Sequence, residues 1–97
     1  MIVLRSTYTG SADEVGALRP AHLEWLDELI ADGTVIAAGR LEDGSGAAIL
    51  GAGTDAEGLL RAFDADPYVS GGVAEYRELV SFPAALGSDA IKELDAR

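Results

Sequence analysis

The sequence predicts a small α+β domain in which two helices cover one face of a four-stranded antiparallel sheet. Two observations lead to this fold class. Segments rich in β-branched residues alternate with segments of helical spacing, in the order strand, helix, strand, strand, helix, strand. The 97 residues suffice for one domain with a modest core, because a chain of this size buries only about two-thirds of its unfolded surface.

The first half of the chain is expected to form two strands around one helix. Residues 1–9 are rich in β-branched side chains and predict the first strand. Pro20 suits the first turn of a helix, where its missing N–H costs nothing, and apolar residues follow at helical spacing over 23–30. Gly33 is a typical helix end, and residues 34–41 predict the second strand.

A hairpin and a second helix follow. The Asp-Gly pair at residues 43–44 is typical of a hairpin turn leading into a third strand over 47–53. Thr54 has Glu57 three residues later, which is the pattern of a capping box. We therefore expect the second helix to begin there and to end before Pro67.

The last strand completes the predicted domain. Residues 73–82 are expected to form it, which gives the ferredoxin-like βαββαβ order over residues 1–83. The remaining tail, residues 84–97, is expected to add a short helix whose cap is either Ser88 or Asp89.

The predicted sheet is apolar on both of its faces. In the second strand Val35 and Ala37 are expected to point one way and Ile36 and Ala38 the other, and the third strand shows the same pattern over 47–50. Two helices can cover only one face. We therefore expect a homodimer in which two copies pack sheet to sheet.

Composition and charge exclude several functional classes. Seven basic residues stand against 17 acidic ones, for a formal net charge of −10. We expect no nucleic acid as partner, because binding a polyanion requires cations, and no membrane surface, because no polybasic stripe is present. Without cysteine no thiolate site can form, and with a single histidine no histidine-rich metal site can form within a monomer. We expect no metal and no cofactor.

The start of the chain predicts the location of the protein. Its apolar run is too short for a signal peptide or a membrane span. We therefore expect a cytoplasmic protein.

The single histidine, His22, is the first candidate for acid–base chemistry. It lies in the apolar stripe of Leu26 and Leu29, so it is expected to face the sheet. A lone histidine on an apolar face is more often a core residue than a functional one. Its place near the predicted helix start favours function, because the ring would be partly open there.

Two aspartates lie at the predicted end of the second helix. A simple helix stop explains Asp64 and Asp66 only in part, because the helix dipole disfavours acids at a C-terminus. Both helices pack on the same face of the sheet in this topology. Asp66 is therefore within possible reach of His22.

Two further residues are candidates for contacts with a ligand. Arg19 precedes Pro20 and is expected to be extended, and its guanidinium would either hold an anionic substrate group near His22 or lie on the surface. Tyr68 is either a wall of the site or a dimer contact.

Two segments of the chain resemble the YCII-related family. They are RPAHLEWLDELIADGTVIAAG, residues 19–39, and AFDADPYVSGGVAEYRELVSF, residues 62–82. The resemblance implies a dimeric α+β barrel of ferredoxin-like subunits, with a histidine and an aspartate in a cleft. The family's histidine corresponds to His22, its aspartate to Asp66, and its glycine after the second strand to Gly39.

The resemblance also implies a class of reaction. A few relatives are lyases that move a proton during loss of chloride from a hydroxylated aromatic ring, and the related muconolactone isomerases move protons on lactones. We therefore expect a cofactor-free lyase or isomerase for a small cyclic or aromatic molecule, in which Asp66 orients His22 for acid–base catalysis. The alternative is a non-catalytic dimeric ligand-binding or accessory module with a structural pair. The sequence does not identify the small-molecule ligand.

Overall fold

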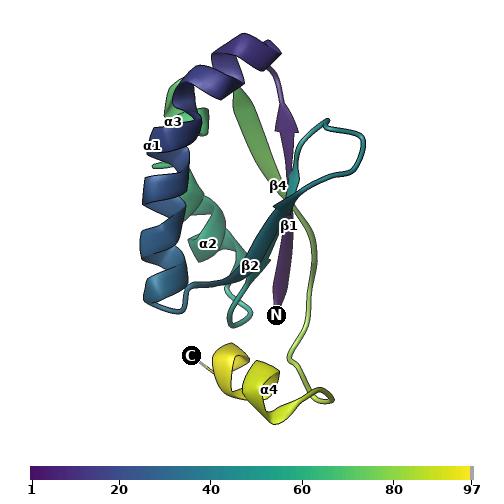
Figure 1. Ribbon diagram of the computed structural model, residues 1–97. Helices are drawn as coiled ribbons and strands as arrows, with labels where there is room; N and C mark the ends of the chain where they lie inside the picture. The colour runs from purple at the N-terminus through teal and green to yellow at the C-terminus, as the bar shows by residue number, and fades with distance from the viewer. Residues whose placement is uncertain (97) are drawn as a thin grey trace.

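A computed structural model describes residues 1–96 and confirms the α+β class. The strands are β1 (Ile2–Tyr8), β2 (Val35–Arg40), β3 (Ala47–Gly51) and β4 (Ala74–Ser81), and the helices are α1 (Ala12–Ala31), α2 (Ala56–Phe63), α3 (Pro67–Ser70) and α4 (Asp89–Asp95). The sheet order is β2-β3-β1-β4, with all neighbours antiparallel. Helices α1, α2 and α3 lie on one face of this sheet, as in a ferredoxin-like domain (Figure 1).

Helix α1 begins well before the predicted start at Pro20. Ser11 is its N-cap and forms a capping box, because its hydroxyl accepts from the backbone N–H of Glu14 at 3.1 Å and the Glu14 carboxylate accepts from Ser11 N–H at 2.8 Å. Pro20 lies inside the helix, where a proline interrupts the hydrogen-bond ladder and causes a kink. The first turns of α1 tilt away from the axis of the rest (Figure 1).

Helix α2 has a different cap from the predicted one. The capping box of Thr54 and Glu57 does not form, because Asp55 is the N-cap and its carboxylate accepts from the N–H of Gly58 at 3.0 Å. The helix ends at Phe63, and a separate short helix, α3, begins at Pro67.

The pairing of β2 with β3 contains an irregularity that the alternation of residues along the strand does not reveal. Val35 pairs with Gly51, but Ala37 pairs with Leu50, so the register shifts by one residue between them. The prediction that Val35 and Ala37 share a face was therefore wrong. Val35 is buried in the core, whereas Ala37 lies on the uncovered face of the sheet.

The core forms two apolar clusters along the covered face of the sheet. The larger one consists of Ile2, Leu4, Leu26, Val35, Ile49, Leu59 and Phe63. The smaller one consists of Val15, Tyr68, Val73 and Ala74. Because α1 contributes Val15 to one cluster and Leu26 to the other, the side chain of His22 comes between the two.

The expected short helix in the tail is present as α4. Of the two proposed caps, the N-cap is Ser88, whose hydroxyl accepts from the N–H of Ile91 at 3.3 Å. Helix α4 lies at the end of the sheet next to the N-terminus and does not cover either face (Figure 1). No helix among the residues that the structure describes is long and apolar enough to cross a membrane.

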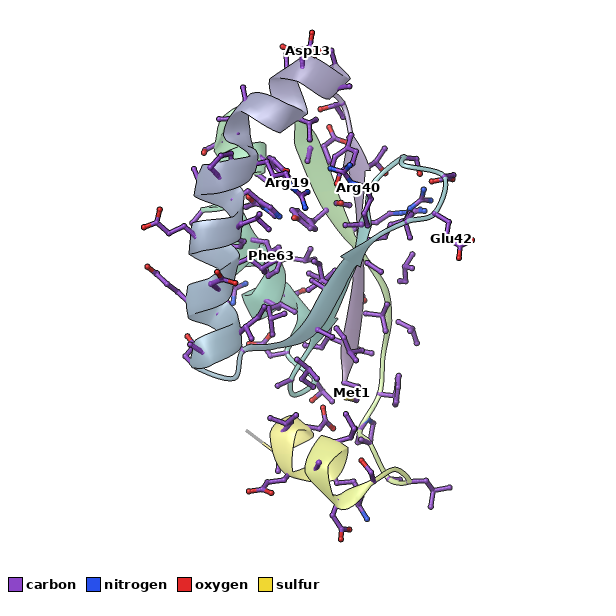
Figure 2. The ribbon with its side chains drawn as sticks, viewed as in Figure 1. Met1, Asp13, Arg19, Arg40, Glu42 and Phe63 are labelled. Carbon is purple, nitrogen blue, oxygen red and sulfur yellow. The ribbon has the colours of Figure 1, made fainter. Side chains whose placement is uncertain are left out.

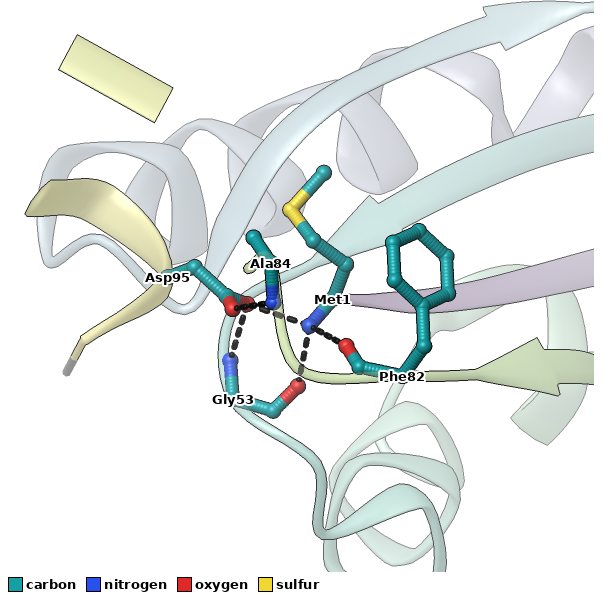
Figure 3. A network of polar contacts seen from close by, with 5 residues as sticks. All are labelled: Met1, Gly53, Phe82, Ala84 and Asp95. Atoms are coloured by element: carbon teal, nitrogen blue, oxygen red, sulfur yellow. Dashed lines mark hydrogen bonds and ion pairs between the residues drawn. The ribbon is translucent and has the colours of Figure 1, made fainter. Parts of the chain in front are cut away.

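A polar contact that we call the N-terminal clasp joins the tail to the start of the chain (Figure 3). The amino group of Met1 donates to the carbonyl oxygens of Gly53 and Phe82, each at 2.7 Å, and to the Asp95 carboxylate. Asp95 also accepts from the N–H groups of Gly53 at 3.1 Å and Ala84 at 2.9 Å. The clasp therefore fixes α4 against two other segments.

Candidate active site

His22 and Asp66 meet beneath the inner face of α1. His22 projects from α1 toward the sheet and is 8% exposed, and Asp66 follows α2 and is completely buried. The Nδ1 atom of His22 lies 2.8 Å from Oδ1 of Asp66. The structure thus brings together the two candidate residues that were predicted from the sequence, although they are 44 positions apart.

Asp66 is the N-cap of α3 and does not lie at the C-terminus of α2, so the reason that the sequence analysis gave for its position was wrong. Its Oδ1 accepts from the N–H of Tyr68 at 2.9 Å, and Pro67 occupies the first helical position of α3. Acids are favoured at a helix N-terminus, so Asp66 does not stand at an unfavourable helix end. Asp64, by contrast, is the exposed C-cap of α2 and makes no contact with His22 among the interactions of the described residues.

Tyr76 completes the surroundings of the buried carboxylate. Its hydroxyl donates to Oδ2 of Asp66 at 2.6 Å. Burial, followed by the hydrogen bond to Asp66, raises the pKa of Tyr76 far above its ordinary value, so the hydroxyl stays protonated and remains a donor. With His22 and the Tyr68 N–H, Asp66 has three donors in place of the water that it loses on burial.

The imidazole of His22 is held in one orientation and one tautomer. Its ring stacks on that of Tyr68, with centroids 3.9 Å apart and planes 9° apart, and the Trp25 ring lies at 6.4 Å. Because both Asp66 oxygens accept hydrogen bonds from other donors, the proton between Asp66 and His22 belongs to Nδ1. Nε2 has no hydrogen-bond partner within residues 1–96, and it can therefore accept a proton.

The other predicted ligand contacts are placed differently from the expectation. Arg19 is helical and exposed, not extended, and it lies one turn before His22 on α1. Tyr68 is 2% exposed and packs on His22 within the subunit. Gly39 lies inside β2 opposite Ala48, on the face that the helices do not cover, so the structure does not bring it to the pair.

No larger ligand set for a metal forms around the pair. Across residues 1–96, no three histidine, cysteine, aspartate or glutamate side chains are grouped so that they could hold a metal ion. The expectation of a cofactor-free protein stays a prediction.

Comparison with protein families identifies the family of the chain. A family model for the YCII-related domain matches residues 1–83. The chain belongs to the YCII-related family. The matched region of this YCII-related protein contains His22 and Asp66 but not α4. Comparison with curated proteins gave no significant match.

Two residues of this YCII-related protein were missed by sequence reasoning. Tyr76 binds Asp66 from β4, and the alternation of that strand, in which Ala74 is buried, is the signal that would have found it. Arg40 lies at the end of β2, near Tyr8. Simple alternation from Val35 places Arg40 on the uncovered face, and only the register shift in β2 turns it toward the helices.

Proposed function

We propose that this protein is a cofactor-free proton-transfer enzyme of the cytoplasm, a lyase or isomerase that acts on a small cyclic or aromatic molecule. The observation that carries the proposal is the buried contact of 2.8 Å between His22 Nδ1 and Asp66 Oδ1. With Nδ1 donating to Asp66, Nε2 is the atom that takes a proton from the substrate and later returns it.

Each residue of the site has a separate role in this chemistry. Asp66 orients the imidazole and stabilises the imidazolium that forms when Nε2 is protonated. Tyr76 and the backbone of Tyr68 hold the carboxylate in place through hydrogen bonds of 2.6 and 2.9 Å. A positioned acid–base group of this kind contributes about 10²–10⁴-fold in rate.

One observation favours the alternative, a non-catalytic ligand-binding or accessory module. Asp66 caps α3 as well as binding His22, and only 10% of the His22 side chain is exposed. A purely structural pair would have these properties too. The test must therefore separate the charge of Asp66 from its hydrogen bonds.

Asp66→Asn makes this separation. An asparagine caps helices well, and its oxygen can accept from His22 and from the Tyr68 N–H. The fold should survive, whereas turnover of a hydroxylated aromatic or lactone substrate should fall by about 10²-fold or more because the imidazolium loses its counter-charge. The matched control is Asp64→Asn, which removes the same charge from an exposed position two residues away.

A second variant tests the proton-accepting atom itself. His22→Phe keeps an aromatic ring against Tyr68 but has no Nε2, so it should fold and lose turnover. Full turnover in both variants would show that the His22–Asp66 pair does not carry the reaction. A wild-type protein without turnover, in which both variants only lower the melting temperature, would be the non-catalytic module.

We also propose that two copies pack through the uncovered face of the sheet. Leu79 is 52% exposed and Val80 49% exposed on β4, and Ala37 and Leu50 extend the same apolar face. Light scattering should give about twice the chain mass of 10.0 kDa. Val80→Glu should yield a monomer, whereas the control Leu23→Glu on α1 should not.

A further inference from the structure

A cleft lies between the first turns of α1 and the nearby ends of β1 and β2. Its volume is about 320 Å³, and its lining includes Tyr8, Val15, Gly16, Arg19, Arg40 and Gly44. Figure 2 shows Arg19 of α1 and Arg40 of β2 in the space between this helix and the sheet. His22 does not line the cleft, but Arg19 places the cleft one helical turn before His22 on α1.

The cleft is positively charged although the chain is strongly acidic. The chain has 17 acidic and seven basic residues, yet Arg19 and Arg40 both line this cleft, and no aspartate or glutamate does. Neither guanidinium forms an ion pair with any group of residues 1–96. Two unpaired cations that share one cleft leave a place for an anion.

Two tyrosine hydroxyls lie near Arg40, where their oxygens can accept from its guanidinium. The guanidinium lies 5.6 Å from the centre of the Tyr8 ring, and the hydroxyl of Tyr8, followed by that of Tyr68, raises the pKa of Arg40. The Tyr68 hydroxyl is buried and has no partner among the described residues. The hydroxyl proton of Tyr68 is therefore not committed to an acceptor within the described residues.

We propose that this cleft binds the carboxylate of a small organic acid through Arg19 and Arg40, with the Tyr68 hydroxyl as a further donor. The proposal names a substrate class for the enzyme. Its reaction rests on the proposed function, whereas the binding of the carboxylate does not. A carboxylate fits because it only accepts hydrogen bonds and its two oxygens match the fork of a guanidinium.

The position of Tyr68 connects this cleft with the reacting atom. One face of its ring stacks on His22 at 3.9 Å, and its hydroxyl is among the groups near Arg40. An acid whose carboxylate is held by the arginines would therefore lie on the Tyr8 side of the Tyr68 ring. Tyr8 lines the cleft and meets the Tyr68 ring edge-on at 5.9 Å between centroids, so it offers an aromatic surface to a flat cyclic body.

The test uses benzoate and its neutral counterpart benzamide, with binding followed by NMR of the ¹⁵N-labelled protein. Benzoate should shift the amide signals of Gly16 and Gly44 in the cleft, and benzamide should not. Arg19→Gln and Arg40→Gln should each weaken benzoate binding about tenfold or more, because each removes a charge-assisted hydrogen bond. Arg61→Gln, an equal charge change at an exposed position of α2, is the control.

Three results would overturn the carboxylate site. They are equal binding of benzoate and benzamide, equal affinity in Arg40→Gln and Arg61→Gln, and binding of inorganic phosphate as tight as that of benzoate. Tyr68→Phe supplies a further check, because it keeps the ring on His22 and removes only the hydroxyl. It should weaken benzoate binding severalfold, and unchanged affinity would remove Tyr68 from the site.

The failure of this proposal can be told apart from failure of the enzymatic one. His22→Phe should keep benzoate binding. If this variant also keeps turnover, the proposed role of His22 in catalysis is wrong and the carboxylate site stands. The opposite result is that turnover depends on His22, while neither Arg19→Gln nor Arg40→Gln changes turnover or benzoate binding. In that case the enzymatic function stands and the carboxylate site is wrong.

Discussion

Asp66 and Asp95 accept hydrogen bonds in the same pattern but in different surroundings. Each carboxylate receives two donors on one oxygen and one on the other. Asp95 binds the terminal amine and two backbone N–H groups at the end of the sheet, where they fix α4. Asp66 is completely buried among aromatic rings, and one of its donors is an imidazole that can gain a proton. An equal number of hydrogen bonds therefore attaches α4 in the clasp and holds the His22–Asp66 pair in the core.

Replacing each aspartate by alanine should give the largest contrast. Asp66→Ala leaves three buried donors without an acceptor, and at about 1–3 kcal/mol for each the loss should be about 3 kcal/mol or more. For a domain of this size that lowers the melting temperature by roughly 12 °C or more. Asp95→Ala should release α4 and leave the melting of the sheet nearly unchanged. Calorimetry checks both variants, and equal losses would contradict the distinction.

A smaller change should sharpen the description of the buried site. Tyr76→Phe removes the donor to Oδ2 of Asp66 and leaves both of the other hydrogen bonds in place. Urea unfolding should show a loss of about 1–2 kcal/mol. Tyr8→Phe is the control, because its hydroxyl does not reach Asp66, and it should be nearly neutral. A Tyr76 variant as stable as this control would show that the third donor is dispensable.

Lowering the pH should protonate Asp95 and release α4 from the N-terminal clasp. The Met1 amine, followed by the N–H groups of Ala84 and Gly53, lowers the pKa of Asp95 in the folded protein. A carboxyl group with a lowered pKa stabilises the docked state above its ordinary pKa and loses that contribution as pH falls through the lowered value. The amide signals of α4 should therefore shift toward random-coil positions below about pH 3.9, because a released helix of 7 residues is too short to persist in water.

The asparagine variant is the control for this titration. Asp95→Asn removes the titrating group, so the signals of α4 should not move with pH through this window. An α4 that is released equally in both proteins would show that other carboxyl groups govern its attachment.

Sequence patterns predicted the elements that local periodicity determines. The stripe of Leu26 and Leu29 correctly placed His22 against the sheet, and the order of elements gave the topology. The predicted start of α1 at Pro20 was wrong, because the capping box of Ser11 and Glu14, which is also present in the sequence, begins the helix earlier.

The faces of β2 could not be predicted in the same way. A register shift between Val35 and Ala37 depends on pairing with β3, and no local pattern reports it. The shift exchanges the two faces for the rest of the strand. Gly39 consequently turns away from His22, and Arg40 turns toward the cleft.

The aromatic residues around His22 make the site observable by optical spectroscopy without a label. The chain has one tryptophan and three tyrosines. Trp25 lies beside His22 and edge-on to Phe63, while Tyr68 and Tyr76 contact the paired residues and Tyr8 lines the adjoining cleft. Nearly all of the protein's near-ultraviolet absorption and fluorescence therefore originates at or next to the site, so the emission of Trp25 can report ligand entry directly.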